Sequence, residues 1–215
     1  MFRWIFLLVI ISIIEIYAFQ AVKTFTKTRW VLLAYIIVSA SAIAFIAYQA
    51  TKFDRSIGQT QMTMITLGTV LLVIVPKLII TFVLLLEDIF RIIIATKNYF
   101  NNYNEDAAYF PERRKFISQL ALGLAAIPFS SLIYGMTLGK YNYKVIKQTV
   151  FFPDLPDDFD GFTITQISDV HSGSFDDPEK IEHAIELVNQ QNSDMILLTG
   201  DIVNTHAKEM HPWID

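Results

Sequence analysis

The stretch ITQISDVHSGSF, residues 164–175, governs how the C-terminal part of the chain folds. It is an apolar run that ends abruptly in acidic and histidine side chains, and ILLTGDIVN, residues 196–204, ends in the same way. Short apolar runs bounded by turn residues predict β-strands. Three ionisable residues follow these two strands: Asp169 and His171 after the first, and Asp201 after the second.

The segment between the two runs, DDPEKIEHAIELVNQQ, predicts a helix. Asp177 is a good N-cap, Pro178 suits the first helical position, and one face is apolar. A strand, a helix and a strand in this order predict a parallel βαβ unit with a right-handed crossover. The second strand, within MILLTG, is almost wholly apolar, which predicts that it is covered on both faces. YKVIKQTVFF, residues 143–152, predicts a further strand.

Ligands of such sheets bind beyond the carboxyl ends of the strands, where the three ionisable residues lie. Asp169 and His171 are two positions apart, so in extended backbone both side chains point to the same side and can grip one divalent cation. Asp201 adds a second carboxylate, and Gly200 and Gly173 let the chain turn without crowding the site. Mixed oxygen and nitrogen ligands suit Mn, Fe or Zn. Two such ions about 3.5 to 4 Å apart clamp a phosphate and generate hydroxide at neutral pH.

The first two thirds of the chain differ in composition. Of the 215 residues, 53% are hydrophobic, which is too apolar for an ordinary soluble domain, and the lack of cysteine excludes disulfides and thiolate metal sites. Residues 1–150 hold 15 of the 17 Lys and Arg but 7 of the 21 Asp and Glu. The acidic remainder suits a cation site and argues against nucleic acid as a partner. Apolar runs of spanning length predict four transmembrane helices, at residues 4–21, 30–47, 63–86 and 116–138.

Basic residues in the links between these spans predict an orientation. The first and third links carry more Lys and Arg than the second, and basic loops stay in the cytoplasm. Both chain ends and the acidic C-terminal part are therefore predicted on the extracytoplasmic side, although Lys140, Lys144 and Lys147 argue mildly against it. ERRKFISQLALGLAAIPF, residues 112–129, resembles a twin-arginine export signal, with Glu112 where Ser or Thr is usual. The alternative is a cytoplasmic basic anchor before an ordinary span.

Two ionisable residues, Glu15 and Lys77, lie inside predicted spans. Charges are costly in lipid, and such residues are either paired or functional. The structural interpretation is an ion pair that holds the first and third spans together. The alternatives are a transport or proton pathway, and access to water.

The motifs SDVHSG and GDIVN resemble the first two motifs, D-x-H and G-D, of the calcineurin-like metallophosphoesterases. The lead-in FPDLPDDFDGFTITQISDVH resembles the membrane-anchored bacterial members in particular. The resemblance implies that Asp169 and His171 ligate one metal ion and that Asp201 bridges two divalent ions, Mn, Fe or Zn. The implied fold is a multi-span α-helical membrane domain at residues 1–139, followed by an incomplete α/β (βαβ) metallophosphoesterase domain at 140–215.

The family also has a G-N-H-[D/E] motif, a further His and a G-H-x-H motif, and none of these occurs here. We therefore expect these residues to be the front part of a longer protein and to be inactive, or nearly so, alone. His206 and His211 are predicted to be loop residues rather than replacement ligands, and His183 a surface or packing residue of its helix.

The resemblance implies a membrane-anchored, metal-dependent phosphoesterase of the bacterial inner membrane, acting on a phosphomonoester or phosphodiester that is lipid-linked or envelope-linked. Its partners are then the lipid bilayer and this substrate. One alternative is a non-catalytic, membrane-tethered phosphoesterase-like domain that binds a ligand or partner. Another is that Asp169 and Asp201 are only turn and cap residues at strand exits, with His171 incidental.

Overall fold

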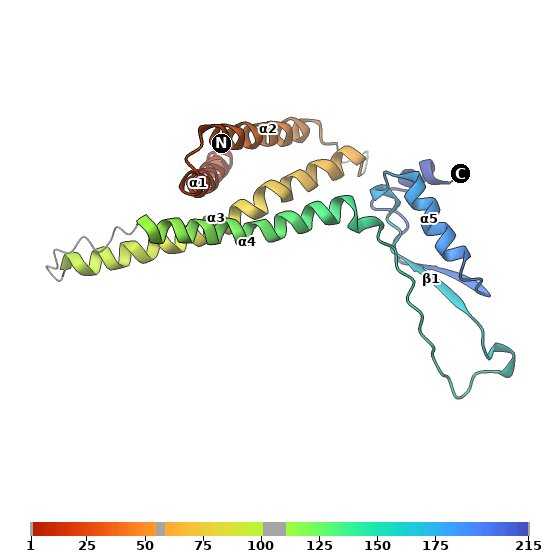
Figure 1. Cartoon of the computed structure of the whole chain (residues 1–215). Coiled ribbons are helices and arrows are strands. Elements are labelled where there is room, and N and C mark those ends of the chain that lie inside the picture. The colour runs from red at the N-terminus through yellow and green to blue at the C-terminus, as the bar shows by residue number, and fades with distance from the viewer. Residues whose placement is uncertain (1, 55–58, 101–110, 215) are drawn as a thin grey trace. The chain divides into compact units, whose positions relative to one another are not determined.

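The structure is a computed structural model that describes residues 2–54, 59–100 and 111–214. Four long helices come first: α1 (Phe2–Phe25), α2 (Arg29–Lys52), α3 (Gln61–Phe100) and α4 (Pro111–Thr137) (Figure 1). Two strands and a helix follow: β1 (Ile164–Ser168), α5 (Pro178–Asn189) and β2 (Met195–Thr199). The remaining elements are short 3₁₀ helices: η1 (Gly139–Tyr141), η2 (Asp157–Phe159), η3 (Ser172–Ser174) and η4 (Ala207–Trp213).

The residues form two compact units. The helical unit comprises Met1–Ala50 and Leu67–Met136, and the C-terminal unit comprises Thr51–Thr66 and Thr137–Asp215. The link between α2 and α3 thus belongs to the C-terminal unit. The predicted domain boundary between residues 139 and 140 stays a prediction.

The four predicted spans are confirmed as helices. Within the described residues, α1 to α4 are each long and apolar enough to cross a membrane. Pro76 lies inside α3 and Pro128 inside α4, as membrane helices tolerate. All four helices begin before the predicted spans, and α1 to α3 also end after them, because hydrogen bonding along a helix does not stop where the apolar run stops. The fourth helix, α4, ends at Thr137, one residue before the predicted end of its span.

The core of the helical unit is built where α1, α3 and α4 meet. Ile80 and Leu84 of α3 pack in one buried cluster with three alanines: Ala21 of α1, and Ala121 and Ala125 of α4. Small residues let helix backbones approach closely, as is usual in membrane bundles. Many apolar side chains elsewhere on these helices are exposed, among them Val38 at 68%. Such surfaces suit contact with lipid rather than with water.

The predicted ion pair between Glu15 and Lys77 is confirmed. Lys77 of α3 is buried, and its Nζ donates to the Glu15 carboxylate of α1 and lies 2.6 Å from Ser39 Oγ of α2. Ser39 Oγ is 3.0 Å from both Glu15 carboxylate oxygens, and Tyr35 Oη donates to Glu15 across 3.4 Å. Every charge in this network therefore has a partner, which a buried charge requires.

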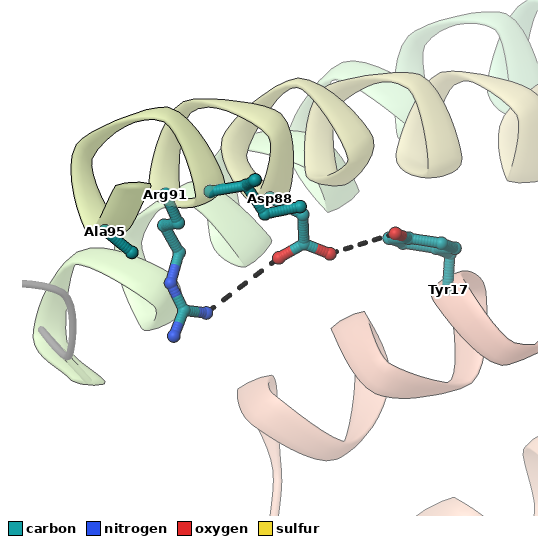
Figure 2. Close-up of a pocket in the computed structure, with 5 residues that line it drawn as sticks. Tyr17, Asp88, Arg91 and Ala95 are labelled. Atoms are coloured by element: carbon teal, nitrogen blue, oxygen red, sulfur yellow. Dashed lines mark hydrogen bonds and ion pairs between the residues drawn. The ribbon is translucent and has the colours of Figure 1, made fainter. Parts of the chain in front are cut away.

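A second polar network joins α1, α3 and α4. Arg114 of α4 donates to the buried Glu87 and, across 2.7 Å, to Asp88 Oδ1, both of α3. Asp88 Oδ2 also accepts from Tyr17 Oη of α1 at 2.9 Å, and Arg91 Nη1 lies 3.8 Å from Asp88 Oδ1. Figure 2 shows Asp88 between Tyr17 and Arg91. These three residues line a pocket of about 400 Å³. The twin-arginine segment thus lies in α4, and Arg114 fixes α4 to α3.

The C-terminal unit contains the predicted βαβ unit. β1 and β2 pair in parallel, from Ile164 opposite Met195 to Ser168 opposite Thr199, and α5 connects them. Asp177 caps α5 by accepting a hydrogen bond from the Lys180 amide at 3.3 Å, and proline occupies the first helical turn. The predicted cap is therefore confirmed.

Two predictions about this sheet are wrong. Residues 143–152 form no strand, because a strand needs a hydrogen-bonded neighbour and only β1 and β2 pair among the described residues. β2 is not covered on both faces, since Met195 to Leu198 are between 43% and 55% exposed. A sheet of two strands and one helix is too small to cover both faces of either strand.

Candidate metal centre

The carboxyl ends of β1 and β2 lie at the same edge of the sheet. The last pair in register is Ser168 with Thr199, and backbone hydrogen bonds continue beyond it. The Asp169 amide donates to the Thr199 carbonyl at 3.1 Å, and the His171 amide donates to the Asp201 carbonyl at 3.1 Å. The segments that carry the three predicted ligands are therefore tied to each other through their backbones.

The backbone at the predicted ligands differs from the extended conformation expected for them. β1 ends at Ser168, and Asp169 and His171 have φ angles of 54° and 47°. The alternation argument that placed their side chains on one side is wrong here, because it holds only in extended backbone. Left-handed conformations are uncommon for residues other than glycine and cluster at functional sites.

The Asp169 carboxylate faces the end of β2. Ser168 Oγ donates to it, and the Asp201 amide donates to it as well. These hydrogen bonds, from Ser168 first and then from Asp201, hold the pKa of Asp169 below its usual range. Gly200 has a φ of 74°, and a Cβ there would lie 2.5 Å from Asp169 Oδ1. The predicted role of Gly200 in keeping this space open agrees with the geometry.

The donors at this edge fit a divalent cation in their chemistry. His171 Nδ1 is buried and has no hydrogen-bond partner among the described residues, so it is available as a ligand. However, no three His, Asp or Glu side chains of the described residues surround a common point as metal ligands would. Asp169, His171 and Asp201 are therefore neighbours through their backbones, and their role as ligands stays a prediction.

The other three histidines lie in or directly beside helices. His206 is the N-cap of η4, and His211 lies within η4. His183 lies in α5, exposed, with Nδ1 3.8 Å from Glu186 Oε2. None belongs to a group of described side chains that could hold a metal ion.

Sequence reasoning missed Glu209, the most connected side chain of this edge. It is partly buried and forms a capping box with His206 at the start of η4. Burial opposes its charge, but hydrogen bonds from Thr205, from the Asn204 amide and from the Gln59 amide outweigh burial and lower the pKa of Glu209 to about 2. The available signal was the spacing of His206 and Glu209, which is that of a capping box.

A second acidic side chain anchors the segment that follows α4. Asp176, in the loop between η3 and α5, accepts hydrogen bonds from Lys140 Nζ and Tyr141 Oη. Burial and the hydrogen bond to Asp176 raise the pKa of Tyr141 to about 12. The segment that contains η1 is therefore hydrogen-bonded to the loop that precedes α5.

The comparison with known families decides the identity of the chain. The family model described as "Probable Calcineurin-like phosphoesterase, transmembrane domain" matches residues 2–140, and the model described as "Calcineurin-like phosphoesterase" matches residues 162–214. The chain belongs to the membrane-bound calcineurin-like phosphoesterases. The predicted fold class is confirmed: a helical membrane domain precedes a βαβ region of the metallophosphoesterase type. Membership of this phosphoesterase family implies dependence on divalent metal ions.

Curated relatives of this chain include a bacterial and an animal protein. "Uncharacterized metallophosphoesterase YkuE" of Bacillus subtilis (strain 168) is 28% identical over 102 residues, which are 46% of this chain and 36% of the relative. "Transmembrane protein with metallophosphoesterase domain" of Danio rerio is 23% identical over 78 residues, which are 36% of this chain and 18% of the relative. The matched part is thus about a third of one relative and under a fifth of the other. No solved structure matches the chain.

Proposed function

We propose that the chain carries part of the metal centre of a membrane-anchored phosphoesterase that hydrolyses a phosphomonoester or a phosphodiester. The observation that carries the proposal is the joined pair of strand ends, with the His171 amide bound to the Asp201 carbonyl at 3.1 Å. This bond keeps the D-x-H segment beside the G-D segment. The match of residues 162–214 to the calcineurin-like phosphoesterases supports the same reading.

Divalent cations at such a site supply Lewis-acid chemistry to a phosphoester. Asp169 and His171 would hold one ion, Asp201 would lie between two ions, and Mn, Fe or Zn suits this donor set. Gly200 leaves room for the Asp169 carboxylate, and the hydrogen bonds from Ser168 and Asp201 hold the pKa of that carboxylate below its usual range. Asp169 therefore offers a charged oxygen donor at this edge of the sheet.

The substrate and the location belong to the same proposal. The four helices of spanning length support a location at the lipid bilayer, where a lipid-linked or envelope-linked phosphoester would reach the enzyme by diffusion along the membrane. The distribution of Lys and Arg supports an extracytoplasmic C-terminal unit. The resemblance of residues 152–171 to membrane-anchored bacterial members of the family supports a bacterial inner membrane.

One observation favours a second candidate, a phosphoesterase-like domain that binds a ligand without hydrolysing it. The described His, Asp and Glu side chains do not surround a common point. A binding domain could keep the fold of the family while it lacks a complete set of ligands.

Manganese-dependent hydrolysis of bis(p-nitrophenyl) phosphate tests the proposal. The protein is purified in detergent as its gene encodes it, and compared with Asp169→Asn and Asp201→Asn. We expect each variant to lose more than about 100-fold in rate, because even outer partners of metal ligands are worth about 10- to 100-fold.

Asp160→Asn is the matched control, because Asp160 is an exposed aspartate of the same unit that lies in a turn before β1. Its rate should equal that of the natural protein. Unchanged rates in Asp169→Asn and Asp201→Asn would contradict the catalytic assignment. Binding of Mn²⁺ without any hydrolysis would favour the binding domain instead.

A further inference from the structure

The Glu209 carboxylate accepts several hydrogen bonds from the segment that follows Asp201. Its Oε2 accepts from the Asn204 amide at 2.7 Å and from the Thr205 amide at 3.2 Å. Its Oε1 accepts from Thr205 Oγ1 at 2.7 Å and from the His206 amide at 3.3 Å. Three consecutive residues, 204–206, are therefore hydrogen-bonded to the same carboxylate.

The same carboxylate packs against the turn that follows His171. A Cβ on Gly173 would lie 2.5 Å from Glu209 Oε2 and 2.8 Å from Asn204 Oδ1. Asn204 Nδ2 also donates to Ser174 Oγ at 2.9 Å, which joins the segment to the other end of η3. Glu209 thus lies between the segment after Asp201 and the segment after His171, and it contacts both.

A third segment reaches the same oxygen atoms. Gln59 lies in the link between α2 and α3. Its backbone amide donates to Glu209 Oε1 at 3.2 Å, and its side-chain Oε1 accepts from Asn204 Nδ2 at 2.9 Å. All of these residues belong to the C-terminal unit. A link between two membrane helices therefore takes part in the support of the candidate metal centre.

We propose that Glu209 is a positioning residue of the phosphoesterase, whose carboxylate sets the spacing between the His171 segment and the Asp201 segment. This proposal rests on the proposed function. Glu209 acts only through its neighbours, because its contacts go to residues 204–206, Gly173 and Gln59 rather than to Asp169, His171 or Asp201. Groups bonded directly to metal ligands orient those ligands and tune metal affinity. Glu209 would act one step further out, through the segments that carry the ligands.

The chemistry of the contacts selects an ionised carboxylate at this position. Every polar contact of Glu209 named above is a donor that points at its oxygens, so the carboxylate accepts in all of them. A glutamine would place an NH₂ donor against backbone amides, which are donors themselves. Glu209→Gln therefore keeps the size of the side chain and breaks about half of this arrangement.

The test measures Mn²⁺ binding by equilibrium dialysis on the detergent-solubilised protein, as its gene encodes it, well below its melting temperature. We expect the Kd for Mn²⁺ to rise about 10- to 100-fold in Glu209→Gln. Glu209→Asp, which retains both acceptor oxygens, should recover part of this loss. Glu186→Gln is the matched control, because Glu186 is an exposed glutamate of α5, and its Kd should equal that of the natural protein.

A purely structural capping role gives a different result. Glu209→Gln would then lower the melting temperature and leave the Kd for Mn²⁺ unchanged at temperatures where the variant is folded, and this result would overturn the proposal. If Glu209→Gln does not accumulate as folded protein, Gly173→Ala replaces it. Its added Cβ displaces the intact Glu209 carboxylate, so the Kd should rise as well, and an unchanged Kd would overturn the proposal.

Asp169→Asn distinguishes this proposal from the proposed function. If Asp169→Asn binds Mn²⁺ as tightly as the natural protein does, the metal centre itself is wrongly assigned and the positioning role falls with it. If Asp169→Asn abolishes binding while Glu209→Gln and Gly173→Ala bind normally, only the positioning role is wrong. Loss of binding in all three variants supports both.

Discussion

Single residues at the ends of β1 and β2 have backbone conformations that are open mainly to glycine. Gly200 has a φ of 74°, and the neighbouring Asp169 and His171 have φ values of 54° and 47°. A left-handed conformation costs a residue with a Cβ about 1 to 2 kcal/mol. Asp169 and His171 carry this conformational energy cost, whereas Gly200 does not because it has no Cβ. A Cβ at Gly200 would also lie against the Asp169 carboxylate.

Replacing Gly200 should therefore affect both stability and the site. We expect Gly200→Ala to destabilise the C-terminal unit by at least about 1 to 2 kcal/mol, since it adds a left-handed Cβ, and to weaken Mn²⁺ binding, since that Cβ displaces Asp169 Oδ1. Thermal unfolding monitored by circular dichroism and equilibrium dialysis with Mn²⁺ measure the two effects.

Gly161→Ala separates the two causes. Gly161 has a φ of 80°, but a Cβ there would meet no atom within 4 Å. It should show the loss of stability without the loss of Mn²⁺ affinity. Equal Mn²⁺ affinities for both variants would show that the contact with Asp169 does not matter.

The helices of the membrane unit are joined by specific polar pairs as well as by apolar packing. Glu15 of α1 and Lys77 of α3 form an ion pair, and Ser39 of α2 bonds to both. Arg114 of α4 bonds to Glu87 and Asp88 of α3. Apolar faces alone fit one another in many registers, whereas paired charges fit in few, so these pairs select which turns of the helices meet.

Removing one member of the Glu15–Lys77 ion pair should destabilise the helical unit more than removing both members. Lys77→Leu leaves the Glu15 carboxylate with only neutral hydroxyl partners, and we expect a loss of about 3 kcal/mol or more in the stability of the helical unit. Glu15→Leu combined with Lys77→Leu removes both charges and should be closer to the natural protein. The thermal stability of each purified variant in detergent, measured by loss of the monodisperse peak after heating, gives the comparison.

Ser118→Ala is a suitable control for this series, because Ser118 is fully buried in α4 and its Oγ has no hydrogen-bond partner among the described residues. It should change the stability little. A double variant that is less stable than Lys77→Leu would contradict the pairing argument.

Across the chain as a whole, the two units depend on different solvents. The helical unit exposes apolar side chains that suit lipid, whereas the C-terminal unit carries most of the acidic residues and all four histidines. The link between α2 and α3 belongs to the C-terminal unit, and the predicted orientation places both on the extracytoplasmic side. These 215 residues contain no cysteine, so single cysteines introduced among them can be labelled to report this orientation.

We expect Asp160→Cys, in the C-terminal unit, to react with a membrane-impermeant maleimide on intact spheroplasts. Thr28→Cys, between α1 and α2, should react only after the membrane is permeabilised, because the basic first link is predicted to be cytoplasmic. Mass spectrometry of the purified protein measures the labelling. The reverse pattern would show that the lysines after the fourth span outweigh the basic links, and would place the candidate metal centre in the cytoplasm.

Local patterns in the sequence were sufficient for the order of the elements. Four apolar runs predicted α1 to α4, and the strand, helix and strand of the C-terminal unit followed from alternation, an N-cap and a proline. The candidate ligands Asp169, His171 and Asp201 were found because they directly follow strands. The predicted strand at residues 143–152 failed, because pairing partners for a strand are not encoded in the strand itself.

The contacts between distant segments required the folded structure. Glu209 contacts Gly173 and Gln59, and Arg114 contacts Glu87. These residues are far apart in sequence, whereas helix and strand periodicity relates only residues within the same element. The left-handed turns at Asp169 and His171 were hidden for the same reason, since the hydrogen bonds to the end of β2 impose them. Short-range patterns therefore specified helices, strands and candidate ligands. The arrangement of those ligands depends on the neighbours that the fold brings beside them.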